Sequence, residues 1–242
     1  MTRLLIDAGN TNIKLAWVND DNWSPVVSLP SNHACELGGY FSEYCGGPVQ
    51  QVWVSNVAGA EVARQISDAC AVRHWSLQFI GAATRQCGVH NGYELPEQLG
   101  SDRWAALIAA WHHVGAACLV VNSGTATTID ALSDSGDFIG GLILPGIALM
   151  RSSLMDATAL LEAQRGDYVA FPHNTSDALF SGAIQASCGA VERQHALLDA
   201  AAPVLLSGGA AHLLMPHLTL QVEKMDNLVL QGLLLIAREI DK

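Results

Sequence analysis

Charged residues are few in this chain, and most of them are acidic. Only 14% of its 242 residues are Asp, Glu, Lys or Arg, and 23 acidic residues against 12 basic ones leave a formal net charge of −11. This balance repels nucleic acids and anionic membranes, so neither is an expected partner. Any phosphate that the protein binds must be held locally, by main-chain amides, a few cations or a carried Mg²⁺.

Paired cysteines and long apolar runs are also missing. The six cysteines are scattered with no CxxC pair, which argues against a zinc site and against disulfides. The N-terminal stretch reaches Asp7 before it could form the apolar centre of a signal peptide. His112 and His113 interrupt the longest apolar run, so no stretch approaches the roughly 18 residues of a membrane-spanning helix. We therefore expect a cytoplasmic protein with no membrane span and no protein-only metal site.

Two similar openings organise the chain, half of whose residues are hydrophobic. Each opening reads as a strand, a glycine turn and a second strand. The first spans residues 4–18 with its turn at 8–12, and the second spans residues 118–132 with its turn at 122–126. This duplication predicts an α/β fold of two halves, residues 1–115 and 116–242. The other segments with a clear pattern are a helix over 104–111 behind Ser101 and Asp102, a helical segment over 227–240, and strands over 52–57 and 138–144.

The first turn lies in DAGNTNIK, residues 7–14, and has the side chains of a phosphate-binding loop. Asp7 ends a strand, where its carboxylate can hold Mg²⁺ through water, and Gly9 tolerates a positive φ and lets the main chain approach a phosphate closely. Lys14 supplies a cation, and the polar residues between them supply hydrogen-bond donors. The pattern is not a Walker P-loop, because it lacks GxxxxGK[ST] and leads into a strand. An ordinary β-hairpin without a ligand is the alternative.

The second turn lies in NSGTATTID, residues 122–130, and strengthens this interpretation. Two glycine turns of one kind in one chain can clamp the phosphates of a nucleotide from both sides. A hairpin without a ligand is again the alternative, and the duplication makes it less favoured.

The stretch GSDRW, residues 100–104, places an acid and a cation where a helix starts. Asp102 can orient an alcohol and accept its proton as the bond to phosphorus forms, and Arg103 can hold an anionic end of the substrate. The alternative is a helix N-cap, in which Ser101 or Asp102 bonds the amides of the first turn.

These three stretches together resemble the type III pantothenate kinases, members of the acetate and sugar kinase, Hsp70 and actin superfamily. The resemblance covers nearly the whole chain, because it extends to NGYELPEQLG at 91–100, FIGGLILPG at 138–146, FPHNTSDAL at 171–179 and LSGGAAHLL at 206–214. It implies a duplicated actin-like, ribonuclease H-like α/β fold whose two halves surround a nucleotide cleft. It also implies ATP-dependent phosphorylation of pantothenate to 4′-phosphopantothenate, the first step of coenzyme A biosynthesis.

The resemblance also assigns roles to single residues. Asp102 is the implied catalytic base, Thr175 an implied pantothenate contact that reaches across a dimer interface, and Ser207–Gly209 the part near the adenosine. The implied partners are ATP with Mg²⁺, pantothenate, a monovalent cation (K⁺ or NH₄⁺) and a second copy of the chain in a homodimer. The implied ATP-binding residues are Asp7, Ala8, Gly9, Asn10, Thr11, Asn12, Ile13, Lys14 and Thr125, and the implied pantothenate-binding residues are Tyr93, Gly100, Ser101, Asp102, Arg103 and Thr175.

One position departs from the family pattern, because Asn122 begins the second turn where the family usually has Asp. An Asn oxygen can still ligate K⁺, but it supplies a dipole instead of a full charge, so we expect weak potassium dependence. Two other functions stay open: an ATP-binding accessory or regulatory protein without efficient transfer, and a kinase for another small alcohol. Pantothenate-dependent release of ADP separates all three.

Overall fold

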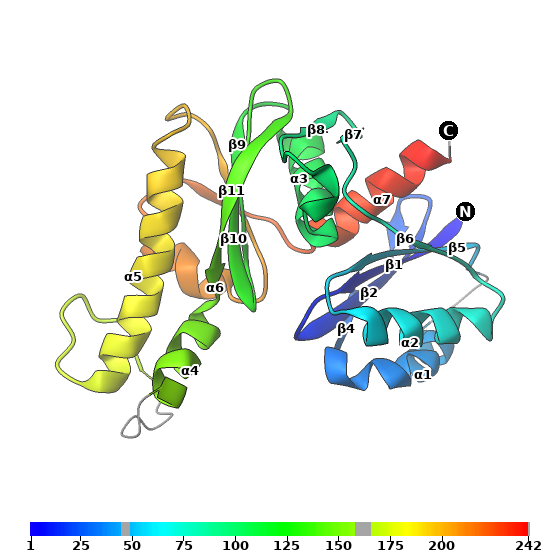
Figure 1. The fold of residues 1–242 in the computed structure, drawn as a ribbon, viewed down its shortest axis with the longest axis horizontal. Coiled ribbons are helices and arrows are strands. Elements are labelled where there is room, and N and C mark those ends of the chain that lie inside the picture. Colours follow the sequence, from blue (N-terminus) through cyan, green and yellow to red (C-terminus); the bar gives the residue numbers. More distant parts are fainter. Residues whose placement is uncertain (45–48, 158–165, 242) are drawn as a thin grey trace. The chain divides into compact units, whose positions relative to one another are not determined.

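The computed structural model describes residues 1–44, 49–157 and 166–241 of the chain. No helix in this part is long and apolar enough to span a membrane. The cysteines within it form no disulfide, and Cys45 lies outside the described residues. Helices and strands occur in both halves of the chain, so the predicted α/β class is confirmed (Figure 1).

The chain divides into two compact units, one of residues 1–112 with 228–242 and one of residues 113–227. The change of unit after residue 112 lies close to the boundary expected near residue 115. The C-terminal segment differs from the expectation, because in the structure it belongs to the first unit. Its apolar residues pack against the first sheet, which the order of segments along the chain does not reveal.

The sheet of the first unit is built around the strand that precedes the first turn. Its strands are β1 (Thr2–Ala8), β2 (Asn12–Asn19), β3 (Asn22–Trp23), β4 (Val27–Pro30), β5 (Gln51–Asn56) and β6 (Ser76–Phe79). β1 pairs antiparallel with β2 and parallel with β5. β4 lies antiparallel to β2, and β6 lies parallel to β5. The strands predicted on both sides of the first turn, and the one predicted over 52–57, are confirmed.

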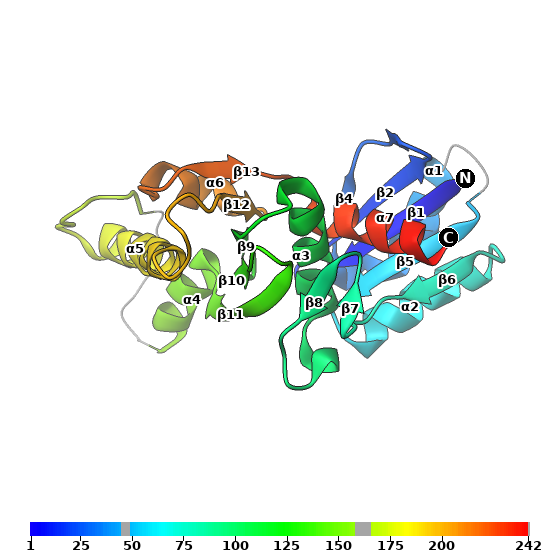
Figure 2. The ribbon, with the colours of Figure 1, turned by 90° about the horizontal axis from the view of Figure 1, so that it is seen from above.

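Helices cover both faces of this sheet. The remaining elements of the unit are η1 (Ser31–Glu36), α1 (Leu37–Tyr44), α2 (Ala60–Ala71), β7 (Arg85–Gln86), β8 (Val89–Asn91), η2 (Pro96–Gln98), α3 (Ser101–Val114) and α7 (Leu228–Ile240). Leu4 and Ile6 enter a core closed by α1 and α2. Because successive side chains of a strand point to opposite faces, Arg3 and Asp7 point to the other face, which α7 covers. Figures 1 and 2 show α1 and α2 on one side of the sheet and α7 on the other.

Polar contacts and one close approach hold α7 in the first unit. Arg3 is buried and pairs with Asp241, and the amide of Gln51 donates to the same carboxylate at 2.8 Å. At Gly232 the helix meets α3 so closely that a Cβ would overlap the main chain of Ala105. The helix predicted over 227–240 is therefore confirmed, and its partners are residues from the start and middle of the chain.

The strands of the second unit repeat the arrangement of the first. They are β9 (Cys118–Ser123), β10 (Ala126–Leu132), β11 (Asp137–Pro145), β12 (Val204–Ser207) and β13 (Val222–Lys224). β9 is antiparallel to β10, which is antiparallel to β11, while β12 is parallel to both β9 and β13. The order β11-β10-β9-β12-β13 thus matches β4-β2-β1-β5-β6, with the same relative directions. The duplication predicted from the two glycine turns is confirmed by this topology.

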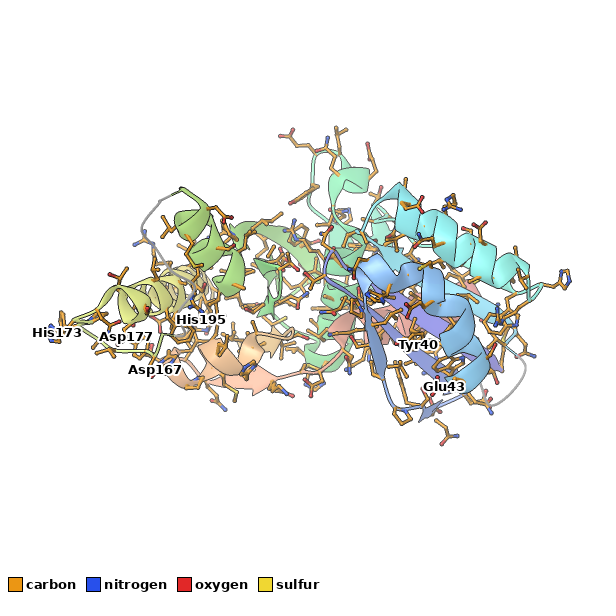
Figure 3. The ribbon with its side chains drawn as sticks, turned by 90° about the horizontal axis from the view of Figure 1, so that it is seen from below. Tyr40, Glu43, Asp167, His173, Asp177 and His195 are labelled. Atoms are coloured by element: carbon orange, nitrogen blue, oxygen red, sulfur yellow. The ribbon has the colours of Figure 1, made fainter. Side chains whose placement is uncertain are left out.

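Two helices pack on the second sheet and on each other. They are α4 (Ile147–Ala157) and α5 (Thr175–His195), and two short elements follow later, α6 (Ala211–Leu214) and η3 (Met215–His217). Asn174 caps α5 by accepting a hydrogen bond from the Asp177 amide at 2.9 Å. The Asp177 carboxylate in turn accepts one from the Asp167 amide at 2.8 Å. Figure 3 shows Asp167 and Asp177 near one another at this end of α5, so the start of the helix is well defined.

Candidate active site

The first turn joins β1 to β2 and is held from within the first unit. The Gly9 amide donates to the Asn12 carbonyl at 3.1 Å. Ser31 secures the turn twice, because its hydroxyl donates to the Gly9 carbonyl at 2.6 Å and its amide donates to the Thr11 carbonyl at 2.9 Å. The side chains of Asn10, Thr11 and Asn12 are exposed. The turn therefore keeps its shape while its polar side chains stay accessible.

Gly9 does not adopt the positive φ that a glycine tolerates at this position. Lack of space for a side chain is what the structure shows at this glycine. A Cβ at Gly9 would lie 3.2 Å from the Asn12 carbonyl oxygen, closer than an ordinary contact. Two other residues of this stretch, Ala8 and Ile13, have fully buried side chains, so only their main chain can face a ligand.

Asp7 lies at the end of β1 that enters the first turn. Its partner on β2 is Lys14, and its partner on β5 is Ser55. Burial raises the pKa of the Asp7 carboxyl to about 7, although attraction to Lys14 lowers it, and the charge of Asp102 adds to the rise. The last contribution means that Asp7 and Asp102 are electrostatic neighbours within the first unit. A cation placed against Asp7 would favour its charged form.

The start of α3 carries the GSDRW stretch. The Trp104 amide donates to the Gly100 carbonyl at 3.0 Å, so the helix begins immediately after Gly100. The Asp102 carboxylate accepts a hydrogen bond from the Arg103 amide at 2.8 Å, which fixes the direction of the acid. The Ser101 hydroxyl does not cap the helix, because it is buried and hydrogen-bonded to another side chain. A Cβ at Gly100 would lie 2.7 Å from Asp102 Oδ1, so glycine leaves room for the carboxylate.

Arg103 and Tyr93 form a contact pair next to this helix start. Arg103 is 6% exposed, and its guanidinium donates to the Tyr93 hydroxyl at 2.8 Å and lies 5.6 Å from the centre of the ring. Asn91 shapes the turn that carries Tyr93, because its side chain accepts from the Tyr93 amide at 3.0 Å and donates to the Pro96 carbonyl at 3.1 Å. Asn91 had no role of its own among the predicted site residues. Its signal was an Asn-Gly pair ahead of Pro96, a common turn pattern.

The second turn joins β9 to β10 in the second unit. Two main-chain hydrogen bonds hold it. The Gly124 amide donates to the Ala126 carbonyl at 2.9 Å, and the Gly146 amide donates to the Thr125 carbonyl at 2.8 Å. The Thr125 side chain is exposed. A Cβ at Gly146 would overlap the Gly124 carbonyl, so a glycine after β11 is required.

Asn122 and the SGG stretch meet at the end of neighbouring strands. Ser207 on β12 is the register partner of Asn122 on β9. Gly208 has a φ of +98°, and a Cβ there would overlap the Ser123 carbonyl and lie 2.7 Å from Asn122 Oδ1. The glycine therefore meets both a conformational and a steric requirement. The family resemblance implies that Ser207–Gly209 lies near the adenosine, but no sequence pattern predicts this contact with β9.

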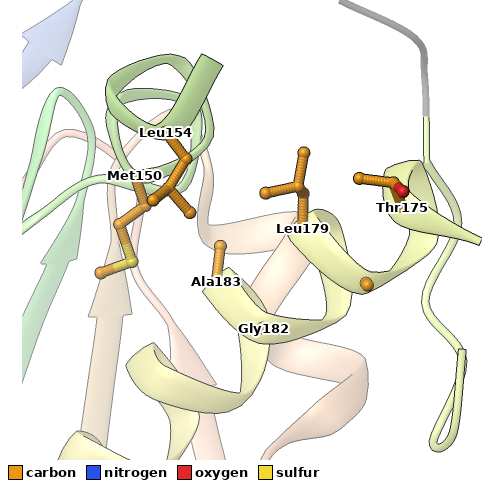
Figure 4. A pocket seen from close by; sticks show the side chains of 7 residues that line it. Met150, Leu154, Thr175, Leu179, Gly182 and Ala183 are labelled. Carbon is orange, nitrogen blue, oxygen red and sulfur yellow. The ribbon is translucent and has the colours of Figure 1, made fainter. Parts of the chain in front are cut away.

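Thr175 is exposed at the first turn of α5 and borders an apolar groove between α4 and α5 (Figure 4). This α4–α5 groove has a volume of about 360 Å³. Asp7, Lys14, Tyr93 and the 100–103 run all lie in the first unit, whereas Thr125 and Thr175 lie in the second. The groove is lined by Met150, Leu154, Thr175, Ala178, Leu179, Gly182 and Ala183.

The donor groups suit a magnesium ion that arrives with a nucleotide. No group of three or more His, Cys, Asp or Glu side chains forms a metal site within residues 1–44, 49–157 and 166–241. Mg²⁺ is usually bound through one or two carboxylates, with phosphates and waters completing its shell. Asp7, a partly buried carboxylate beside an exposed polar turn, fits that description.

Comparison with known proteins decides the family. The family model for type III pantothenate kinase matches residues 3–196. This chain belongs to the type III pantothenate kinase family. The type III pantothenate kinase of Nitrosospira multiformis (strain ATCC 25196 / NCIMB 11849 / C 71) is 45% identical over 240 residues, which cover 98% of this chain and 91% of that relative. Members of a pantothenate kinase family use ATP and a divalent metal, so both are implied here.

Solved structures confirm the fold of this type III pantothenate kinase family member. A conserved Campylobacter jejuni protein assigned to the Baf family of transcriptional activators matches with a TM-score of 0.64 and 23% identity, covering 98% of each chain. A glucokinase from an Antarctic psychrotroph matches with a TM-score of 0.52 and 10% identity, covering 98% of this chain and 99% of its own. At these identities the likeness concerns the fold alone. The expected duplicated actin-like α/β fold is confirmed.

Proposed function

We propose that this chain transfers the γ-phosphoryl group of ATP to the primary hydroxyl of pantothenate, forming 4′-phosphopantothenate for coenzyme A biosynthesis. The observation that carries the proposal is the pairing of two carboxylates in the first unit of a type III pantothenate kinase family member. Asp7 ends β1 beside the glycine turn, and its register partner Ser55 is hydrogen-bonded to Ser101, the residue directly before Asp102. Since the donor is ATP, we place the protein in the cytoplasm.

The first turn is the proposed site of the ATP phosphates. Main-chain amides around Gly9 and the exposed side chains of Asn10 to Asn12 supply donors, and Lys14 supplies the positive charge next to Asp7. Magnesium bound with the nucleotide supplies charge neutralisation of the phosphates. From the second unit, Thr125 and Ser207–Gly209 are proposed as further contacts to ATP, supported by the matching position of the second turn in the repeated topology.

Asp102 is the proposed base for the acceptor alcohol. An ionised carboxylate can hold the hydroxyl in line with the phosphorus and take its proton as the new bond forms. The Arg103 amide holds the Asp102 carboxylate in one direction, which supports this role. Arg103 and Tyr93 are proposed to bind pantothenate, whose carboxylate suits a guanidinium, together with Gly100, the main chain of Ser101, and Thr175.

A coupled assay of ADP release over a panel of small alcohols tests this function. We expect release with pantothenate, with 4′-phosphopantothenate as the product by mass spectrometry, and little release with the other acceptors. Release with a different alcohol would identify a kinase of another substrate. No release with any acceptor, together with ATP binding, would favour the accessory or regulatory alternative.

The same assay tests the monovalent cation. Because Asn122 offers only an amide oxygen, we expect the rate in KCl or NH₄Cl to stay within about threefold of the rate in tetramethylammonium chloride. Replacing Asn122 with Asp should increase the dependence on K⁺. Activation of the unmodified protein by about tenfold or more would contradict this expectation.

The second unit supports a homodimer, which we propose as the assembly. Phe171 is 83% exposed, Ile143 64% and Leu154 51%, and Leu154 also lines the α4–α5 groove. The lining of this groove is apolar apart from Thr175, and an exposed apolar groove marks an interface more often than a free surface. A second copy buries the same surface by a twofold axis, the commonest symmetry of soluble oligomers. Thr175, at the rim of the groove, would then lie near the partner.

Charge introduced into the groove is expected to break this dimer. Replacing Leu154 with Glu should shift the mass in sedimentation velocity from dimer to monomer, since a buried unpaired carboxylate is strongly unfavourable. The matched control is Leu197→Glu, because Leu197 is 78% exposed and lies beyond the far end of α5. A monomeric unmodified protein at micromolar concentration would contradict the proposal.

A further inference from the structure

We propose that the hydroxyl of Ser55 positions Asp102 for catalysis by holding the first residue of α3, Ser101. The inference rests on the proposed function and adds a residue that no motif contains. Ser55 is 0% exposed and Ser101 8% exposed, and their hydroxyl oxygens lie 2.9 Å apart. The two residues are 46 positions apart in the chain, so the contact is created by the fold.

The position of Ser55 connects the two carboxylates of the site. Ser55 lies near the end of β5 and is the register partner of Asp7 on the parallel strand β1. Side chains of register partners on parallel strands point to the same face of the sheet. Ser55 therefore shares the face of Asp7 and bonds the residue that directly precedes Asp102. This single hydrogen bond ties the start of α3 to the strand beside Asp7.

A packing role alone does not explain two buried serines at this place. Trp53, two residues earlier on the same face of β5, and Trp104 and Ala105 on α3 are all buried and apolar. Apolar side chains could fill the same space, but they could not fix the orientation of α3 relative to β5. A hydroxyl pair requires one separation and one orientation between strand and helix. It thereby sets where the carboxylate of the next residue, Asp102, can lie.

The Ser55–Ser101 hydrogen bond is expected to affect the reaction by aligning the Asp102 carboxylate with the acceptor alcohol. The segment entering α3 contains Gly100, which has no side chain to restrain it, so the helix start depends on its contacts. Loss of the Ser55 hydroxyl leaves the Ser101 hydroxyl buried without its partner, and the first turn of α3 is expected to shift to satisfy it. A displacement of about 1 Å in a catalytic group can lower a rate by up to about 100-fold. Binding of ATP, which uses other residues, is expected to be unaffected.

The test compares Ser55→Ala, Ser101→Ala and the double variant in the pantothenate-dependent assay, with thermal unfolding measured in parallel. We expect Ser55→Ala to lower kcat by about tenfold while the KM for ATP stays within about twofold. The double variant removes both partners, so it should regain thermal stability but remain slow. A purely structural pair would instead recover its rate along with its stability.

The matched control is Ser187→Ala in the second unit. Ser187 is 0% exposed, and its hydroxyl donates to the Ala183 carbonyl at 2.9 Å within α5, so the variant also deletes a buried hydroxyl. Its kcat should equal that of the unmodified chain. An active unmodified chain with Ser55→Ala and the double variant both within twofold of its kcat would overturn this inference alone. An unmodified chain without pantothenate-dependent ADP release would overturn the proposed function and this inference together.

Discussion

Replacing Asp102 with Asn is expected to lower turnover by about 10²- to 10⁴-fold, the usual contribution of a positioned general base. The amide has nearly the same shape and can still accept the hydrogen bond from the Arg103 amide, so the start of α3 should be preserved. What it loses is the ability to take the proton from the acceptor alcohol. The KM for ATP should stay within about twofold, because the proposed phosphate site lies at the first turn.

A matched substitution separates this effect from a general change of charge. Asp68 lies on α2, is exposed and pairs with Arg64 at 2.8 Å, so Asp68→Asn also removes one acidic charge from the first unit. Its turnover should equal that of the unmodified chain. Steady-state kinetics with pantothenate as the varied acceptor make the comparison. Undiminished turnover in Asp102→Asn would remove Asp102 from the role of base.

Replacing Asp7 with Asn is expected to stabilise the protein at pH 8 and to abolish most of its activity. The folded pKa of Asp7 is about 7, because of burial, against an ordinary value of 3.8. Between these two values the folded state holds a proton that the unfolded state has released, so stability falls as the pH rises from about 4 to about 7. Above pH 7 the charged carboxylate destabilises the fold by an amount on the order of a few kcal/mol, which Asn avoids.

Urea unfolding at pH 4 and pH 8, without nucleotide, measures this difference. The free energies of unfolding of Asp7→Asn and of the unmodified chain should nearly coincide at pH 4 and separate at pH 8. Asp241→Asn gives the opposite control: hydrogen bonds from Gln51 and Arg3 lower the pKa of Asp241, so this variant should lose stability at pH 8. If Asp7→Asn were less stable than the unmodified chain at pH 8, burial of the charge at Asp7 would not be the dominant effect.

The activity of the Asp7 variant shows why the chain keeps an unfavourable group. A carboxylate that is partly withdrawn from water is destabilising by itself in its charged form, yet it becomes favourable when Mg²⁺ and phosphates arrive. Asp7→Asn should therefore lose the thermal stabilisation that Mg²⁺-ADP gives to the unmodified chain. We expect its turnover to fall by at least about 100-fold, since the metal contact acts on the charge that develops during transfer.

The local patterns of the sequence were sufficient for the strands and for the positions of the turns. The apolar and β-branched runs on both sides of Gly9 and Gly124 predicted β1, β2, β9 and β10, because strand propensity and turn chemistry depend only on near neighbours. The steric reason for Gly9 was missed, since it depends on the Asn12 carbonyl and not on a positive φ. Of the two residues named in the alternative of a helix cap, Ser101 does not cap α3, because its hydroxyl bonds Ser55 on β5, whereas the Asp102 carboxylate does accept from the Arg103 amide.

The amino-acid sequence by itself determined the two strand–turn–strand openings, their duplication, the acid at the start of α3 and the family to which the chain belongs. The tertiary structure alone decided that α7 returns to the first unit, that Asn91 shapes the Tyr93 turn, that Gly208 lies against Ser123, and that Ser55 meets Ser101. The physical reason is the range of the interactions. Periodicity and turn chemistry act over a few residues, whereas the burial of a carboxylate or the partner of a hydroxyl depends on segments that meet only when the chain has folded.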